Sequence, residues 1–197
     1  EMAELPGAME AGEFDLVGFA VGIADRDALI TGATITPGDV LIGLPSQNLR
    51  SNGFSLARRV LLERAQLPLD GPAYKGAHHS LADELLAPSV IFSPAIAALQ
   101  KAVDVRGVAH ITGGGLPENL ERLFRSMGAD LEIPKWNLPG IEKLYRHVDA
   151  EDRFHTFNMG IGWVAIVSES DVDAALAAGP GGVLIGRMVP EEGVRVR

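Results

Sequence analysis

Three consecutive glycines between an apolar stretch and an amphipathic one constrain this chain more than any other feature. Residues 108–112 predict a strand that stops at Gly113-Gly-Gly115. Pro117 then stands in the first turn of a predicted helix, whose apolar face carries Leu116, Leu120, Leu123 and Phe124. A glycine turn leading into a helix leaves backbone N–H groups free at the positive end of the helix dipole, where phosphate and other anions bind. The segment therefore predicts either an anion cradle or a plain tight connection.

A second polar loop repeats this design. The loop 45–53 follows a predicted strand over 40–44 and precedes a helix whose apolar residues begin at Phe54. Ser51 or Asn52 is predicted to cap that helix. His110 and Thr112 stand just before the glycines, so we expect an imidazole and a hydroxyl beside the same turn. The two helix starts are expected to line one anion site, and the alternative is two well-capped helices without a common ligand.

Three further residues carry polar chemistry. Asn158 interrupts an apolar strand predicted over 157–167, and an unpaired buried amide costs roughly 1–3 kcal/mol. Its side chain is therefore either tied to local backbone or directed at a ligand. Glu1 and Glu4 offer carboxylates for a metal ion or a base, and the alternative is that these terminal groups are solvated.

The remaining periodicity predicts one α+β domain, with a mixed or antiparallel sheet packed by helices. Further strands are predicted over 14–24, 183–189 and 194–196, and further helices from Ser93-Pro94, over 141–148, and from Ser170 to Gly179. These elements do not alternate as regular βαβ units.

Composition narrows the function classes. The 197 residues are 47% hydrophobic and 22% charged, which suffices for one domain with a sizeable core. A net charge of −9 argues against a general nucleic-acid or anionic-membrane binder. The chain has no cysteine, which excludes disulfides and thiolate metal sites and favours a cytoplasmic location. No apolar run approaches the roughly 20 residues of a membrane span.

Seven motifs occur in one order and together resemble the aminoimidazole ribonucleotide synthetases, also called phosphoribosylformylglycinamidine cyclo-ligases, of purine biosynthesis. They are Glu1-Met-Ala-Glu-Leu-Pro-Gly7, Phe14-Asp-Leu-Val-Gly-Phe-Ala-Val-Gly22, Gly38-Asp-Val-Leu-Ile-Gly43, Ser51-Asn-Gly-Phe-Ser-Leu56, Leu85-Leu-Ala-Pro88, His110-Ile-Thr-Gly-Gly-Gly-Leu-Pro-Glu-Asn119 and Phe157-Asn-Met-Gly-Ile-Gly162. The resemblance runs nearly end to end but covers only the second half of that enzyme. It implies that residues 1–197 are the C-terminal domain. A preceding N-terminal domain, absent from this chain, would supply the dimer interface and most contacts to ATP and Mg²⁺.

The resemblance also implies a reaction and a site. The family uses ATP to activate the formyl amide oxygen of formylglycinamidine ribonucleotide, after which a nitrogen closes the imidazole ring. His110 is implied to have a polar or acid/base role near the reacting amide. Substrate or phosphate contacts are implied for Ser51, Asn52, Gly53, Thr112, Gly113, Gly114, Gly115 and Asn158. The chain departs from the family pattern in two motifs: Met2 stands where threonine is usual, and Leu85-Leu-Ala-Pro88 continues as Ser89-Val-Ile-Phe92, where the family has threonine and tyrosine, so that Phe92 offers no hydroxyl.

We therefore expect a homodimeric parent enzyme, while this chain alone is expected to be inactive and to bind no cofactor tightly. Two alternatives stay open. One is another member of the same ATP-binding superfamily, such as thiamine-monophosphate kinase, selenophosphate synthetase or a hydrogenase-maturation protein. The other is a free-standing anion-binding or interaction domain. Apolar strands near the start, without their usual domain, are expected to expose an apolar edge that favours self-association.

Overall fold

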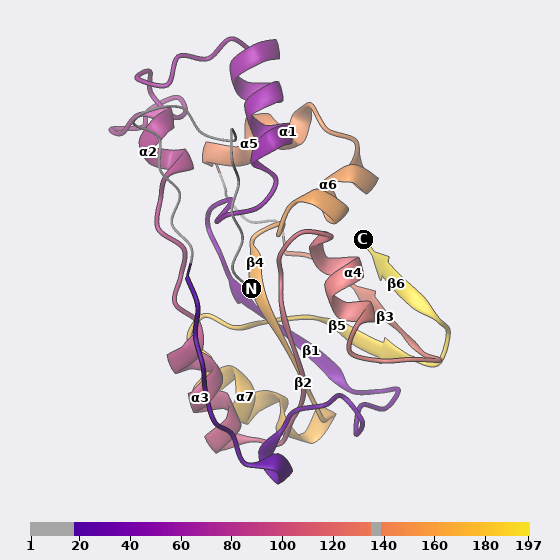
Figure 1. Ribbon diagram of the computed structural model, residues 1–197. Helices are drawn as coiled ribbons and strands as arrows, with labels where there is room; N and C mark the ends of the chain where they lie inside the picture. The colour runs from indigo at the N-terminus through magenta and orange to yellow at the C-terminus, as the bar shows by residue number, and fades with distance from the viewer. Residues whose placement is uncertain (1–17, 135–138) are drawn as a thin grey trace, which may run out of the picture.

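The computed structural model describes residues 18–134 and 139–197 of the chain. In these residues one six-stranded sheet has the strand order β2-β4-β1-β5-β3-β6 (Figure 1). Every pairing is antiparallel except that of β3 with β6, so the sheet is mixed and the predicted α+β class is confirmed. The strands are β1 (Val40–Pro45), β2 (Val105–His110), β3 (Gly128–Leu131), β4 (Ile161–Val167), β5 (Val183–Val189) and β6 (Gly193–Val196).

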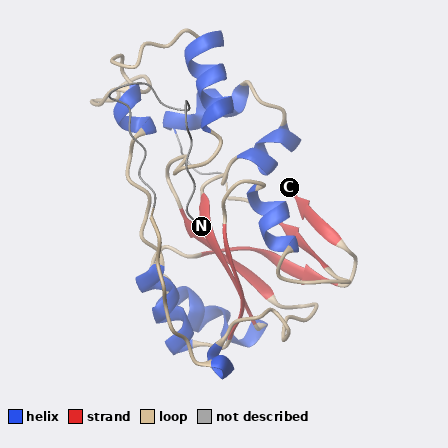
Figure 2. Ribbon diagram, in the orientation of Figure 1, coloured by secondary structure: helices blue, strands red, loops and turns tan. Residues whose placement is uncertain are grey.

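Helices cover both faces of this sheet (Figure 2). They are α1 (Phe54–Arg58), α2 (Leu81–Leu85), α3 (Ser93–Ala102), α4 (Gly115–Glu121), α5 (Pro139–Arg146), α6 (Ala150–Thr156) and α7 (Val172–Ala178). On one face α3 and α7 pack against Ile42, Ala165 and Val167. On the other face α4 packs against Leu41 and Val164. Residues 40–44 of β1 are all buried because this strand lies between two neighbours and two helical layers. None of the described helices is long and apolar enough to cross a membrane.

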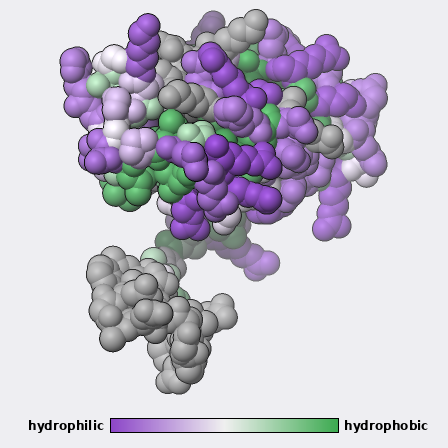
Figure 3. All heavy atoms as spheres, turned by 90° about the horizontal axis from the view of Figure 1, so that it is seen from above, coloured by the Kyte–Doolittle hydropathy of each residue, from purple (hydrophilic) through white to green (hydrophobic). Residues whose placement is uncertain are grey.

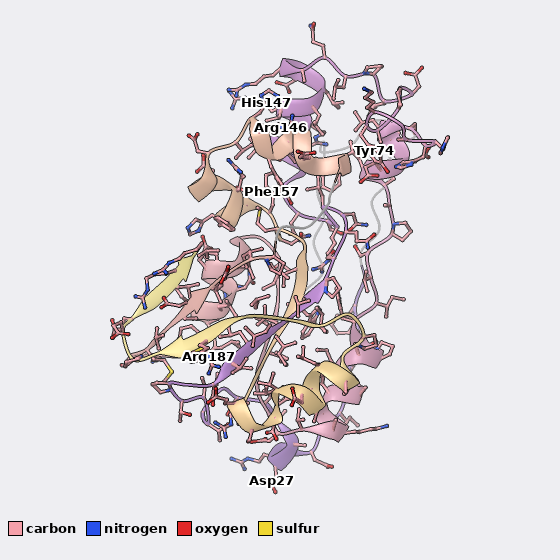
Figure 4. All side chains as sticks on the ribbon, turned by 180° about the vertical axis from the view of Figure 1, so that it is seen from behind. Asp27, Tyr74, Arg146, His147, Phe157 and Arg187 are labelled. Atoms are coloured by element: carbon pink, nitrogen blue, oxygen red, sulfur yellow. The ribbon has the colours of Figure 1, made fainter. Side chains whose placement is uncertain are left out.

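A second apolar cluster lies beyond the end of the sheet, where α1, α2 and α5 gather (Figure 1). α1 continues as a π-helical stretch over Arg59–Arg64, which buries Val60 and Leu61. Phe157, 1% exposed, joins this cluster and lies between the helical group and the sheet (Figure 4). Seen from above, this end of the molecule is mainly hydrophilic, with an apolar area toward one side (Figure 3). The Phe157 segment thus anchors the helical group to the start of β4.

Three local predictions are wrong. Residues 18–24 form no strand, and Phe19 and Val21 are each 82% exposed, because no described strand lies beside them (residues 14–17 lie outside the described part). No side chain caps α1: the residue before it is Gly53, with a left-handed φ of 80°, so neither Ser51 nor Asn52 is the cap. The strand predicted from 157 begins only at Ile161, because Met159 and Gly160 have positive φ angles and form a turn.

The predicted helices and strands elsewhere are confirmed with shifted ends. α3 begins at Ser93-Pro94 as expected, and β5 and β6 lie within one residue of the predicted ranges. The helix expected from Ser170 begins at Val172, after a short 3₁₀ turn, and ends before Gly179. β3 and α6 were not predicted. Their sequences are short, and β3 is a strand only because β5 and β6 flank it.

Candidate functional site

The glycine turn connects β2 to α4 and packs closely against the end of α6. Gly114 and Gly115 have φ angles of 91° and 60°, which side chains rarely adopt. A methyl group on Gly115 would overlap the carbonyl oxygen of Phe154, and one on Gly53 would overlap the ring of Phe157. Gly53 and Gly115 are therefore required by close packing against residues 154–157. This packing explains both glycines without a ligand.

Asn119 holds the turn in shape from within α4. Its Nδ2 donates to the carbonyl oxygens of Gly113 and Gly115, at 3.2 and 2.7 Å. Its Oδ1 accepts from the hydroxyl of Thr112 at 3.2 Å and from Nη1 of Arg122 at 3.1 Å. The Thr112 hydroxyl is thus committed to the turn itself. Sequence reasoning missed this role of Asn119, although the residue closes the motif that contains the glycines.

Gly113 is the open part of the turn. Apart from adjoining residues, the nearest atom to a methyl group placed there would be Oδ1 of Asn52, at 4.0 Å. In the described part of the chain, the N–H groups of Gly113 and Gly114 have no acceptor. The side chain of Glu118 lies over Gly114 and also pairs with His155 at 3.5 Å. The turn therefore offers two N–H donors, with a carboxylate beside them.

The loop 46–53 reaches the same place from β1. Nη1 of Arg50 donates to the carbonyl oxygens of Ile111 and Gly162, at 2.9 and 3.0 Å. Its Nη2 contacts Nε2 of His110, and its guanidinium carbon lies 5.6 Å from the ring centre of Phe92. The two loops lie beside each other and are in contact through Arg50, while a common anion site remains a prediction. Arg50 itself was missed, although it is the only charged residue of the polar loop.

His110 lies at the end of β2, opposite Trp163 of β4. The two rings stack with centroids 5.0 Å apart and planes 24° apart, and Trp163 in turn contacts Phe92. Partial burial, together with the positive charge of Arg50, lowers the pKa of His110 below its usual value. Near neutral pH the imidazole is therefore neutral. Phe92 is 6% exposed and packs against Trp163. At this position the ring therefore supports the stack, and there is no hydroxyl to contact a ligand.

The remaining residues predicted for the site are Asn158, Ser51, Glu1 and Glu4. Asn158 is tied to backbone on both sides of its amide: Nδ2 donates to the carbonyl oxygen of Asn48, and Oδ1 accepts from N–H of Gly160, both at 2.8 Å. Of the two roles predicted for Asn158, the structure shows hydrogen bonds to local backbone. Ser51 is exposed and follows Arg50 directly. Glu1 and Glu4 lie outside the described residues.

No group of three metal-ligating side chains is found within residues 18–134 and 139–197. The described residues thus offer no ready-made cluster of side chains for a metal ion. A cavity of about 1030 Å³ lies over β3 and β5 and includes Glu132, Leu184 and Arg197 in its lining. No residue of the glycine turn or of the loop 46–53 lines it, so we place the candidate site by its converging polar groups and not by cavity size.

Comparison with known families decides the membership of the chain. Residues 36–197 match the family described as AIR synthase related protein, C-terminal domain. The chain belongs to this family. Its β1, glycine turn and β4 all fall inside the matched C-terminal domain.

Curated relatives of this AIR synthase related domain include phosphoribosylformylglycinamidine cyclo-ligases. Phosphoribosylformylglycinamidine cyclo-ligase of Myxococcus xanthus (strain DK1622) is 45% identical over 193 residues, covering 96% of this chain and 54% of the relative. The protein of the same name from Bacillus subtilis (strain 168) is 42% identical over 202 residues, covering 98% and 58%. The chain thus spans little more than half the length of the curated relatives that it matches.

Solved structures share the fold at low identity. Thiamine-monophosphate kinase from Stenotrophomonas maltophilia K279a matches with a TM-score of 0.54 and 19% identity, over 88% of this chain and 54% of that one. The E. coli hydrogenase maturation protein HypE matches with a TM-score of 0.52 and 22% identity, over 84% and 48%. T. maritima PurL, solved in complex with FGAR, matches with a TM-score of 0.52 and 14% identity, over 87% and 27%. These three similarities concern the fold alone.

Proposed function

We propose that this chain is the C-terminal part of a phosphoribosylformylglycinamidine cyclo-ligase. The parent enzyme closes the imidazole ring of aminoimidazole ribonucleotide with ATP. The convergence of two loops far apart in the sequence carries this proposal. Arg50 and Asn52 of one loop meet His110 and Gly113 of the other, so a cation, two free N–H groups and an imidazole gather at one end of the sheet.

Each group has a physical role in such a reaction. The N–H groups of Gly113 and Gly114 would hold an anionic oxygen of the substrate phosphate or of the transferred phosphoryl group. The guanidinium of Arg50 adds positive charge to the same region, and in the described residues no carboxylate pairs with it. Ser51 and Asn52 would contact the same ligand from the other loop. Asn158 supports that loop through the carbonyl oxygen of Asn48.

We expect ATP and Mg²⁺ to bind mainly to the N-terminal part of such an enzyme. When bound, ATP supplies the phosphoryl group that turns the formyl oxygen into a leaving group. In line with the family resemblance, we place the Mg²⁺ contacts on the preceding domain of such an enzyme, or on Glu1 and Glu4. A homodimeric parent and a cytoplasmic location belong to the same proposal.

The test is a reconstitution. The purified chain is incubated with formylglycinamidine ribonucleotide, ATP and Mg²⁺, alone and together with the N-terminal half of the Myxococcus xanthus relative. We expect aminoimidazole ribonucleotide only in the mixture. Robust turnover by the chain alone would refute the requirement for a missing half.

A binding measurement separates the alternatives. Calorimetry with formylglycinamidine ribonucleotide and with thiamine monophosphate should favour the first ligand. The opposite preference would support a kinase-type relative, and no binding of either ligand, alone or in the mixture, would support an interaction domain.

A further inference from the structure

Arg50 and His110 form a pair that the family resemblance did not include. They are 60 positions apart in the sequence, and the guanidinium Nη2 contacts the imidazole Nε2. Arg50 is fixed on both sides of this contact, because Nη1 donates to two carbonyl oxygens and the guanidinium lies over the ring of Phe92. Its backbone also has a left-handed φ of 59°. The side chain is therefore held by four neighbours before any ligand arrives.

The chemistry of the two groups decides how the proton of the imidazole is placed. A guanidinium is a donor only and stays protonated in proteins. The nitrogen that it contacts must then be the acceptor, so Nε2 carries no proton. A neutral imidazole in that state has its proton on Nδ1. In the described part of the chain Nδ1 has no hydrogen-bond acceptor, so this N–H is free for a ligand.

The neighbours of His110 support the neutral form. Trp163 from β4 stacks on the ring and carries no charge, and Phe92 lies behind Trp163. Arg50 from the loop 46–53 is the charged group that acts on the ring, and its charge opposes a second proton. No carboxylate from these elements faces the imidazole to favour the cationic form.

We propose that Arg50 is a positioning residue that holds His110 as the neutral Nδ1–H tautomer, so that the imidazole serves as a hydrogen-bond donor and not as a base. The expected acceptor is an anionic or carbonyl oxygen, such as a phosphoryl oxygen or an amide oxygen. Only the identity of that acceptor rests on the proposed function. The acid/base role implied for His110 by resemblance is thereby narrowed to donation.

The tautomer is measured directly in the ¹⁵N-labelled chain without substrate. Long-range ¹H–¹⁵N spectra of the histidine rings distinguish a protonated from an unprotonated nitrogen, and the variant His110→Gln assigns the His110 signals. We expect a protonated Nδ1 and an unprotonated Nε2 in the wild-type chain. A protonated Nε2 would overturn the proposal, whatever the variants show.

Variants of Arg50 test whether this residue causes the Nδ1–H tautomer of His110. In Arg50→Met we expect the proton to move toward Nε2 and the titration midpoint of His110 to rise. Arg50→Lys keeps a donor-only cation and should keep the Nδ1–H tautomer. Arg58→Met removes the same charge from an exposed position and should leave the His110 spectrum unchanged. An identical His110 spectrum in wild type and a folded Arg50→Met would contradict the inference, and if that variant does not fold, Arg50→Leu, which also lacks a donor, takes its place.

Failure of this inference and failure of the proposed function are distinguishable. An Nδ1–H tautomer in a chain that yields no activity on reconstitution would refute the function alone. An Nε2–H tautomer in a chain that reconstitutes activity would refute the role of Arg50 alone.

Discussion

The side-chain amide of Asn119 donates a hydrogen bond to the carbonyl oxygen of Gly115 at 2.7 Å, from inside the helix that this glycine begins. Asn119 is 5% exposed, and the same side chain also bonds the hydroxyl of Thr112. The shape of the glycine turn is therefore set by a side chain and not by glycine flexibility alone.

Asn119→Ala is expected to lower the free energy of unfolding by about 2–3 kcal/mol, because the buried carbonyl oxygen of Gly115 and the half-buried hydroxyl of Thr112 both lose this partner. Urea unfolding followed by circular dichroism measures the change. Asn52→Ala, at a side chain with no hydrogen bond among the described residues, is the matched control. A loss below about 0.5 kcal/mol for Asn119→Ala would show that the turn holds its shape without it.

Gly115→Ala and Gly113→Ala should behave oppositely. The first places a methyl group on the Phe154 carbonyl oxygen at a positive φ, so we expect a loss of about 2–4 kcal/mol in unfolding free energy. The second meets open space and should change stability by less than about 1 kcal/mol while weakening phosphate binding. Urea unfolding and phosphate titration of both variants provide the comparison. Unchanged phosphate affinity in Gly113→Ala would remove Gly113 from the site.

Glu118→Gln is expected to strengthen binding of inorganic phosphate about three- to tenfold. Its carboxylate lies over Gly114, and this negative charge would oppose an anion bound at the turn by roughly 1 kcal/mol in a solvated site. Phosphate titration followed by NMR of the glycine amides measures the affinity. Glu121→Gln removes the same charge from the other end of α4. Equal gains in the two variants would point to net charge, and not to the position of Glu118.

The neutral state of His110 predicts a pH dependence of stability. Its pKa in the folded chain lies below that of an unfolded histidine, which is about 6.5. The neutral ring therefore contributes stability above that pH, and the contribution is lost as the pH falls through the folded pKa. We expect the unfolding free energy of the wild type to fall more steeply than that of His110→Gln as the pH is lowered below about 6.5, where a histidine of the unfolded chain becomes protonated. Parallel curves would mean that the ring ionises equally in both states.

The isolated chain is expected to self-associate through residues 18–24. Phe19, Val21 and Ile23 are 82%, 82% and 102% exposed, and this segment precedes the matched domain, which begins at residue 36. Light scattering should show a mass that rises with concentration. The double variant Phe19→Ser/Val21→Ser should reduce that rise. A monomer at all concentrations would place the segment outside any contact surface.

Local sequence signals predicted much of the fold. The apolar run before Pro45 became β1, the Ser93-Pro94 pair began α3, and the β-like stretch from 183 became β5, because each is decided by side chains near one another in the chain. The prediction failed where pairing with a neighbouring strand decides whether a segment becomes a strand. β3 has only four residues and is held by β5 and β6, while the apolar residues 18–24 pair with no described strand and form none themselves.

The order of residues was enough to predict that three glycines follow a strand, that polar residues flank them, and which family these motifs resemble. The role of each group became visible only in the folded chain. The structure showed that Gly53 and Gly115 are glycine because residues 154–157 approach them, that Asn158 is tied to backbone, and that Arg50 meets His110 across 60 positions. The physical reason is the range of the forces involved. Periodicity and capping act between near neighbours, whereas close packing and the pairing of a guanidinium with an imidazole depend on where the whole sheet brings two loops together.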